Sequence, residues 1–353
     1  MKDLSSLHRA AQQLVSTLTE GGDPANPIQR RALFMKLLEQ HIAILGKTGS
    51  GKSYAAKGFA ELLLAKHRRL CVIDPTGVWW GLRADSTGKK PGFPIYLFGR
   101  EHGLPHPIAR PPDDVFLLPH HGTALGEIIG TTDTSAVLDT RIMTIKERTT
   151  FFADFAETLL RTNRGPLTLM IDEAHLFMPQ ARPSDAAGVR MLDAANNLVS
   201  LGRGIGLRIV LISQRPAKVH KDSITQSETL IVLRLIAPQD RRAIEDWIGE
   251  WAQPHEGREM LRSLASLRTG EGWIWAPELG VLESGRFPRI TTYDSSKAPD
   301  GVSRQITKLP AMRPHSMLDL ETIKQRLQSS TPPGRAEKSR VAKLNPKEAE
   351  ENA

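Results

Sequence analysis

One stretch of eight residues constrains this chain more than any other feature. Gly46–Ser53 matches the phosphate-binding pattern G-x-x-x-x-G-K-S/T at every position. The apolar run Ile42–Leu45 precedes it, and an amphipathic stretch over 53–66 follows it, which predicts a strand, a loop and a helix in that order. This is the context that the pattern requires, and it disfavours the alternative of a glycine-rich turn that binds nothing.

Each part of the predicted loop has a physical task. Glycines let backbone N–H groups curl around an anion, and the N-terminus of the following helix adds free donors and a positive dipole end. Lys52 places a charge on the β- and γ-phosphates, and the Ser53 hydroxyl is a ligand for Mg²⁺. The sequence therefore predicts a nucleotide site formed by Gly46, Lys47, Thr48, Gly49, Ser50, Gly51, Lys52 and Ser53.

Further apolar runs read as strands that are covered on both faces. They are Leu70–Ile73, Leu167–Ile171, Ile209–Ile212 and Leu230–Leu233. Helix patterns over 55–63 and 151–160 alternate with them, and this alternation favours an α/β fold with a mostly parallel sheet. Residues 84–135 are expected to hold loops and short strands. Trp273–Trp275 and Phe287–Tyr293 suggest a terminal β-hairpin or small meander.

Changes in composition, and breaks in the residue pattern at glycine and proline, divide the chain into parts. We expect a helical leader over 1–40, an α/β domain that contains the phosphate-binding loop over 41–298, and a polar tail over 299–353. The tail is expected to be largely disordered apart from one short helix at 316–327, whose apolar residues could dock on a neighbouring element.

Charge and residue usage exclude some classes of protein. There are 47 Lys and Arg against 39 Asp and Glu, a net charge of +8, which permits a polyanionic partner. A single cysteine, Cys71, rules out an intrachain disulfide and Cys-rich zinc modules, and it reads as a small buried hydrophobe. No apolar run approaches the ~20 residues of a membrane span. These features predict a cytoplasmic protein with no membrane partner.

Two carboxylates follow the third predicted strand. Asp172 at the strand tip could hold Mg²⁺, and Glu173 next to it could activate the attacking water as a general base. An acidic pair at a strand end is often only a solvated terminus. Together with a complete phosphate-binding loop, the catalytic interpretation is favoured, and Glu173 argues against a switch that binds nucleotide without hydrolysing it.

Three more residues are candidates at strand ends or in nearby loops. Gln214 follows Ile209–Ile212 and could sense the γ-phosphate, although Pro216 could instead simply start a turn there. Arg203 lies in a glycine-flanked loop and could act as an arginine finger on a neighbouring subunit, or could be a solvated surface residue. The alternatives for the arginine finger are Arg190, Arg208 and Arg215. Asp74 ends the second strand, where Asp-Pro is also a common turn former.

These motifs together resemble the HerA–FtsK group of P-loop ATPases, and within it the central domain of HerA-like helicases. The similarity covers most of residues 41–293. Its most specific part runs from Gly202–Gly206 through Ser213–Pro216 to Ile231–Leu235.

The resemblance implies a particular version of the fold. This is an α/β P-loop NTPase of the additional-strand, catalytic-Glu type, with a mostly parallel sheet, helices on both faces and, at the C-terminal side, a small β element and polar tail. The additional strand is expected between the loop strand and the acidic-pair strand. The resemblance also implies ATP as the nucleotide and a homo-oligomeric ring, usually hexameric, with ATP sites at subunit interfaces and DNA in the central channel.

The resemblance assigns roles to residues that were already singled out. By this resemblance, Lys52 and Ser53 contact phosphate and Mg²⁺, Asp172 binds the metal, and Glu173 is the general base. Gln214 senses the γ-phosphate, and Arg203 acts across the subunit interface. Asp74 corresponds to the acidic residue that the family has after its second strand.

One departure from the family concerns the N-terminal side. HerA-like helicases carry an N-terminal β-barrel, whereas a helical leader precedes the first strand here, so docking of a nuclease through such a barrel is not expected. The expected function is a Mg²⁺-dependent ATPase that translocates or unwinds DNA in a ring. The alternative is an ATPase scaffold of a defence, conjugation or packaging machine that acts with a separate effector protein.

Overall fold

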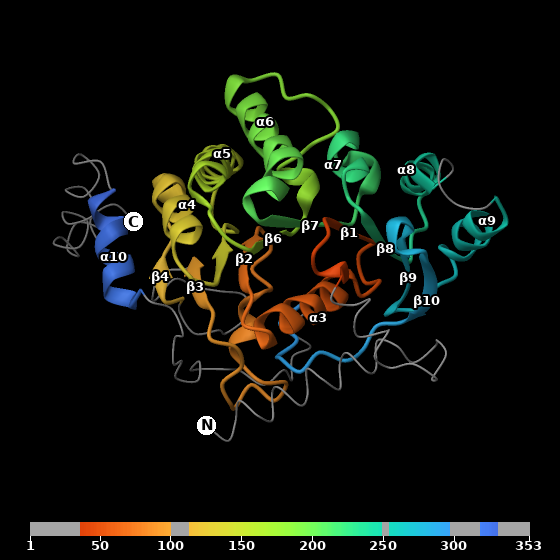
Figure 1. Cartoon of the computed structure of the whole chain (residues 1–353), viewed down its shortest axis with the longest axis horizontal. Coiled ribbons are helices and arrows are strands. Elements are labelled where there is room, and N and C mark those ends of the chain that lie inside the picture. The colour runs from red at the N-terminus through yellow and green to blue at the C-terminus, as the bar shows by residue number, and fades with distance from the viewer. Residues whose placement is uncertain (1–35, 100–112, 249–253, 297–317, 331–353) are drawn as a thin grey trace, which may run out of the picture.

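A computed structural model describes residues 36–99, 113–248, 254–296 and 318–330 (Figure 1). The expected helical leader lies outside the described residues except for 36–40, where Leu37 and Leu38 are buried. Much of the expected tail lies outside them as well. Among the helices within the described ranges, none has the length and apolarity needed to cross a lipid bilayer.

The described residues form one ten-stranded sheet with the order β10-β9-β8-β1-β7-β6-β2-β5-β3-β4. Neighbouring strands are parallel from β8 across to β4, and β9 and β10 join as an antiparallel hairpin at one edge. The strands are β1 (Ile42–Leu45), β2 (Arg69–Asp74), β3 (Tyr96–Gly99), β4 (Val115–Phe116), β5 (Ala136–Asp139), β6 (Leu167–Ile171), β7 (Leu207–Ser213), β8 (Thr229–Leu233), β9 (Glu271–Ala276) and β10 (Val281–Arg286). The mostly parallel α/β sheet predicted from the apolar runs is confirmed.

The strand order contains the additional strand that the family resemblance implies. β1 leads into the phosphate-binding loop and β6 leads into the acidic pair, and β7 pairs with both of them. The carboxyl end of β7 therefore lies between the loop and the two carboxylates.

Helices cover both faces of this sheet, as Figure 1 shows. Along β1, Ala43 and Leu45 join the core on one face, whereas Ile42 and Ile44 join the core that includes α3. This alternation is the two-residue period of a strand that is buried on both sides. The helices are α3 (Lys52–Ala65), α4 (Gly122–Thr131), α5 (Ile145–Thr162), α6 (Ala186–Leu201), α7 (Lys221–Thr225), α8 (Pro238–Ile248), α9 (Pro254–Ser263) and α10 (Leu320–Ser329).

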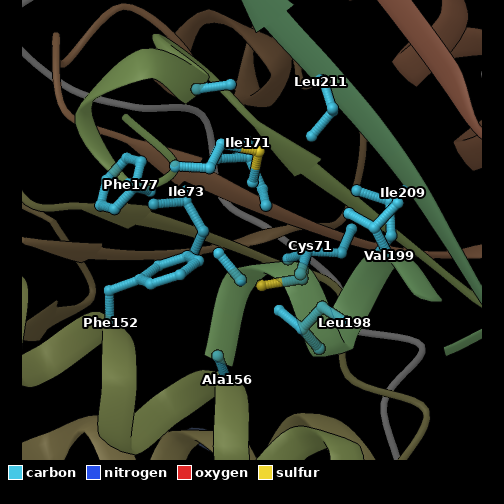
Figure 2. Close-up of a cluster of buried hydrophobic side chains, with 14 of the residues drawn as sticks. Cys71, Ile73, Phe152, Ala156, Ile171, Phe177, Leu198, Val199, Ile209 and Leu211 are labelled. Carbon is cyan, nitrogen blue, oxygen red and sulfur yellow. The ribbon is translucent and has the colours of Figure 1, made fainter. Parts of the chain in front are cut away.

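The core on the face of α5 and α6 is built from strand residues that point toward these helices. Figure 2 shows Cys71 and Ile73 of β2 beside Phe152 of α5 and Leu198 of α6. All four side chains are 0% exposed. Cys71 is a free buried thiol, as expected of a small hydrophobe.

A helix in the glycine-rich region was not foreseen. α4 packs directly against α5, and a Cβ at Gly122 or Gly126 would come within 2.5 and 2.7 Å of carbonyl oxygens of that helix. Glycine usually weakens a helix, so its presence favoured a loop here. The glycines instead permit close helix packing.

The second strand of the terminal hairpin also differs from the expectation. β10 ends at Arg286, and Phe287–Tyr293 leaves the sheet. The buried carboxylate of Glu61 in α3 accepts the backbone N–H groups and hydroxyls of Thr291 and Thr292 at 2.6–3.0 Å. These bonds replace strand pairing, so the segment lies along α3 instead of extending the sheet.

The tail contains the expected short helix within the described residues. Asp319 caps α10 by accepting the Thr322 N–H at 2.7 Å. Ile323 and Leu327 are buried in the same core as α4 and α5. The predicted docking of this helix is therefore confirmed.

The buried His41, just before β1, makes stability depend on pH. Its Nδ1 accepts the Ile209 N–H at 2.9 Å, which requires the neutral ring. Burial, together with the charges of Arg208 and Arg203, lowers the pKa of His41 to about 4. The unfolded chain, with a His pKa near 6.5, binds the extra proton in this window, so the stabilising effect of neutral His41 is present above pH ~6.5 and is lost as pH falls toward 4.

We therefore expect the free energy of unfolding, measured in urea, to fall by about 2 kcal/mol between pH 7 and pH 5 through this group alone. His41→Asn keeps a hydrogen-bond acceptor but does not titrate. The free energy of unfolding of this variant should therefore fall by about 2 kcal/mol less between pH 7 and pH 5 than that of the unmodified protein. Parallel curves for the two proteins would contradict the assignment.

Candidate active site

The phosphate-binding loop connects β1 to α3 at the carboxyl edge of the sheet. Gly49 and Gly51 have positive φ values of 75° and 96°, which favour glycine at both positions. The Gly46 N–H bonds to the Ser213 carbonyl at 3.2 Å, and the Lys47 N–H bonds to the Arg234 carbonyl at 2.9 Å. These bonds fix the loop to the ends of β7 and β8.

The interior of the loop fits a phosphate group. The hydroxyl of Ser50 is buried and has no hydrogen-bond partner within the described part of the chain. A Cβ at Gly46 would lie 2.6 Å from that hydroxyl, so a larger residue would close the loop. Gly51 supplies no side-chain cap to α3, and the first-turn N–H groups have no intrahelical acceptor.

The acidic pair at the end of β6 faces the loop lysine. The Nζ of Lys52 lies 4.0 Å from Oδ1 of Asp172 and 3.4 Å from Oε1 of Glu173. Burial raises the pKa of Glu173, the Lys52 charge opposes this, and the Asp172 charge adds to it. The arrangement holds two carboxylates and one cation in a largely buried space.

Glu173 has an unusual backbone conformation. Its φ and ψ are 46° and 51°, in the left-handed region that residues with a Cβ rarely adopt. Such strain persists only where the surroundings impose it, and it is frequent at functional sites. The turn directs the residue after the strand back toward the loop, where Lys52 meets it.

Gln214, at the end of β7, lies between the loop and the acidic pair. Its side-chain oxygen accepts a hydrogen bond from the Thr48 hydroxyl, and its backbone is near enough to the Glu173 carboxylate to lower the pKa of that group. The structure thus brings Gln214 together with Lys52 and Glu173, as the position of β7 predicts. Its role as a γ-phosphate sensor remains a prediction.

The residues available for Mg²⁺ are oxygen donors of the kind that the ion prefers. Asp172 is 1% exposed at the end of β6, and Ser53 lies in the first turn of α3. In the described ranges, no group of three or more His, Cys, Asp or Glu side chains forms a metal cage. A site with few protein ligands fits an ion that takes further oxygens from phosphate and water.

Asp74 lies next to Asp172 and holds a turn. It is fully buried and accepts the backbone N–H groups of Thr76 at 3.0 Å, Gly77 at 2.7 Å and Trp79 at 2.9 Å. Burial, together with neighbouring carboxylates including that of Asp172, raises the pKa of Asp74 to about 7. The turn-forming alternative thus describes its contacts, and contact with nucleotide remains a prediction.

Arg203 does not join this group within one chain. It lies in the short turn Gly202–Ile205, which precedes β7, and it forms an ion pair with Glu228, which precedes β8. Its side chain is 59% exposed. Because β1, β7 and β8 are parallel, this position is at the amino edge of the sheet, opposite the loop. Any action on a nucleotide would therefore require a neighbouring subunit.

Some contacts of the site were not anticipated. The indole N–H of Trp79 donates to Asp172, and His175 lies 3.4 Å from Glu173. The loop before β9 also supports the phosphate-binding loop, since the Gly270 N–H bonds to the Ser50 carbonyl at 2.9 Å. Trp79 and His175 each follow the end of a strand within a few residues, and this position in the sequence could have indicated them as candidate site residues. Nothing in the sequence pattern indicates the contact of Gly270.

Comparison with known proteins finds sequence similarity to one family over part of the chain. Residues 29–91 match the family model for the central domain of helicase HerA. A probable DNA double-strand break repair helicase HerA of Methanocaldococcus jannaschii is 32% identical over 109 residues, or 31% of this chain and 20% of that protein. The HerA helicase of Pyrococcus furiosus is 29% identical over 109 residues, or 31% of this chain and 18% of that protein. The aligned part thus spans about a fifth of each relative.

The fold is shared with a solved structure of low sequence identity. The plasmid coupling protein TrwB, in complex with the GTP analogue GDPNP, has a TM-score of 0.50 and 11% identity, covering 74% of this chain and 88% of that one. The complete phosphate-binding loop and the strand order therefore give this chain an α/β P-loop fold, and part of its sequence is similar to the central domain of helicase HerA.

Proposed function

We propose that the chain is a Mg²⁺-dependent ATPase that couples ATP hydrolysis to DNA translocation or unwinding in a homo-oligomeric ring. The observation that carries the proposal is the convergence of Lys52, Asp172, Glu173 and Gln214 at one edge of the sheet. A protein that only bound nucleotide would not need a buried carboxylate placed as a base.

The residues of the chain divide the chemical work. The loop N–H groups and Lys52 hold the β- and γ-phosphates, and Gln214 contacts the γ-phosphate. Mg²⁺, when bound near Asp172 and Ser53, neutralises charge on the phosphate oxygens. Glu173 accepts the proton of the attacking water. Burial raises the pKa of Glu173, which makes the carboxylate a stronger base, and the Lys52 charge opposes this shift.

The ring follows from the position of Arg203 in this proposal. The residue is exposed and lies on the opposite edge of the sheet from its own loop, so a neighbour's site is the one it could complete. An arginine supplied by a neighbour stabilises the charge that develops on the phosphate and links hydrolysis to subunit motion. Closed rings provide such an interface at every subunit.

Arg203→Ala tests this interface. We expect ATP hydrolysis to fall by roughly a hundredfold while nucleotide affinity stays close to normal, because the loop is intact. Mixing Arg203→Ala subunits with Lys52→Ala subunits should restore part of the activity, since some interfaces then combine an intact loop with an intact arginine. Arg242→Ala, an exposed position on α8, is the control. Mixed oligomers that form but show no recovery would argue against action across an interface.

DNA as the partner is tested by the rate of hydrolysis. We expect ATP turnover to rise when duplex or single-stranded DNA is added, and the stimulation to weaken as salt is raised, because phosphate contacts are salt-sensitive. Native mass measured under the same conditions should show an oligomer. Turnover that is indifferent to DNA, together with a stable complex with a second protein, would favour the effector-scaffold alternative instead.

A further inference from the structure

The indole of Trp79 makes a hydrogen bond that a purely hydrophobic side chain could not make. Its ring is fully buried in the core that includes α3, and its Nε1–H donates to Oδ2 of Asp172 at 3.0 Å. The hydroxyl of Thr76 lies 3.3 Å from the same oxygen. The Thr76 hydroxyl has a single proton and lies closer to Oδ1 of Asp74, at 2.9 Å, so the indole N–H is the main donor to this oxygen of the proposed metal-binding carboxylate.

The other oxygen of Asp172 is directed toward the phosphate-binding loop. Oδ1 lies 4.0 Å from Nζ of Lys52, and it accepts the backbone N–H of Glu173 at 3.0 Å. The two oxygens thus have different surroundings: Oδ2 faces the buried turn and Oδ1 faces the loop. A carboxylate with one oxygen held by hydrogen bonds presents its second oxygen in a fixed direction.

Asp74 holds the turn that supplies these donors. Its Oδ2 accepts the Trp79 N–H at 2.9 Å, and its Oδ1 accepts the N–H groups of Thr76 and Gly77. The backbone of Trp79 is thereby fixed to the end of β2, which is the neighbour of β6 in the sheet. Asp74 thus fixes the turn, the turn fixes the position of the Trp79 indole, and the indole holds Asp172.

We propose that Trp79 is a positioning residue that orients Asp172 toward Mg²⁺, supported by the Asp74 turn. The proposal rests on the proposed function, because it gives Asp172 the role of metal ligand. Hydrogen bonds to the non-ligating atoms of metal-binding side chains fix their orientation, and their loss commonly weakens metal binding by roughly ten- to a hundredfold. The indole N–H also needs this acceptor, since a buried donor without a partner is destabilising.

The test replaces the donor and keeps the aromatic ring. Trp79→Phe removes Nε1–H, and we expect the Mg²⁺ concentration needed for half-maximal binding of an ATP analogue, measured by calorimetry, to rise by roughly tenfold or more. Affinity for the analogue in EDTA should remain close to that of the unmodified protein. The Mg²⁺ concentration for half-maximal hydrolysis should rise in parallel.

Trp80→Phe is the matched control. Trp80 is also buried, but its ring packs on Tyr293 at 5.3 Å between ring centres, away from the acidic pair. This variant removes a similar volume and should leave the Mg²⁺ requirement unchanged. Should Trp79→Phe fail to fold, Thr76→Val removes the hydroxyl that lies between Oδ1 of Asp74 and Oδ2 of Asp172, and it should raise the Mg²⁺ requirement in the same direction by a smaller factor.

The outcomes separate this inference from the proposed function. If the unmodified protein binds the analogue equally with and without Mg²⁺, the metal site itself is wrong. If the unmodified protein requires Mg²⁺ and folded Trp79→Phe requires the same concentration, Trp79 only fills space and the positioning role is refuted. Equal losses of affinity in EDTA and in Mg²⁺ would also refute it, because they would indicate a general distortion of the loop.

Discussion

We expect Lys52→Ala to lower the affinity for ATP by roughly a thousandfold, because at least two charge-assisted contacts to phosphate are lost and each contributes about 1.5–3 kcal/mol. Lys52 is also the cation closest to the acidic pair in the structure, at 3.4 Å from Glu173 and 4.0 Å from Asp172. Its removal therefore leaves two buried carboxylates facing an empty position. Binding is measured by calorimetry with a non-hydrolysable ATP analogue in the presence of Mg²⁺.

The control for this experiment lies on the same helix. Lys66→Ala removes a lysine at the end of α3, away from the loop, and should bind the analogue normally. Thermal unfolding of both variants shows whether the fold is retained, since uncompensated buried carboxylates are expected to destabilise Lys52→Ala. Normal analogue binding by folded Lys52→Ala would remove the loop as the nucleotide site.

Local chemistry explains why the loop and the acidic pair could be located from sequence. A phosphate-binding loop is a continuous segment whose glycines, lysine and hydroxyl act in fixed order, so the pattern in Gly46–Ser53 carries the geometry with it. The apolar runs around it are strands buried on both faces, and their carboxyl ends must share one edge in a parallel sheet. That rule is sufficient to bring Asp172 and Gln214 to the loop.

Contacts between distant segments could not be predicted in the same way. The support of the loop by Gly270 and the binding of Thr292 to Glu61 join positions more than 200 residues apart. They depend on where the terminal hairpin leaves the sheet, and β10 ends before the segment that its apolar residues suggested. The glycines of α4 favoured a loop at the level of sequence, but they lie in a helix, where they permit close packing against α5.

The position of Arg203 illustrates a different limit of a single chain. Spacing places it just before β7, and the structure shows it at the edge opposite the loop, paired with Glu228. Its distance to a nucleotide is a property of an assembly and not of the sequence around it. Glu173, by contrast, can be judged within one chain, because Lys52 and His175 both lie 3.4 Å from its carboxylate.

Glu173→Gln should separate binding from hydrolysis. The amide keeps the size of the side chain but cannot accept a proton from water, so we expect ATP turnover to fall by roughly a thousandfold. Affinity for ATP should be retained or increased, since the carboxylate charge next to the phosphates is removed. Turnover is measured at saturating ATP and Mg²⁺, and affinity is measured by calorimetry on the same preparation. Glu278→Gln, an exposed position with the same change of charge, is the control.

The pH dependence of the unmodified protein gives an independent test of Glu173. Burial raises the pKa of this carboxyl above its ordinary value, and a general base acts only when it is deprotonated. Turnover should therefore decline as pH falls through that raised pKa, at a pH where ordinary glutamates are still ionised. The small residual activity of Glu173→Gln should lack this decline, because no carboxyl titrates there. An unchanged rate in the variant, or the same acid limb in both proteins, would assign the base to another group, and His175, beside Glu173, would be the next to test.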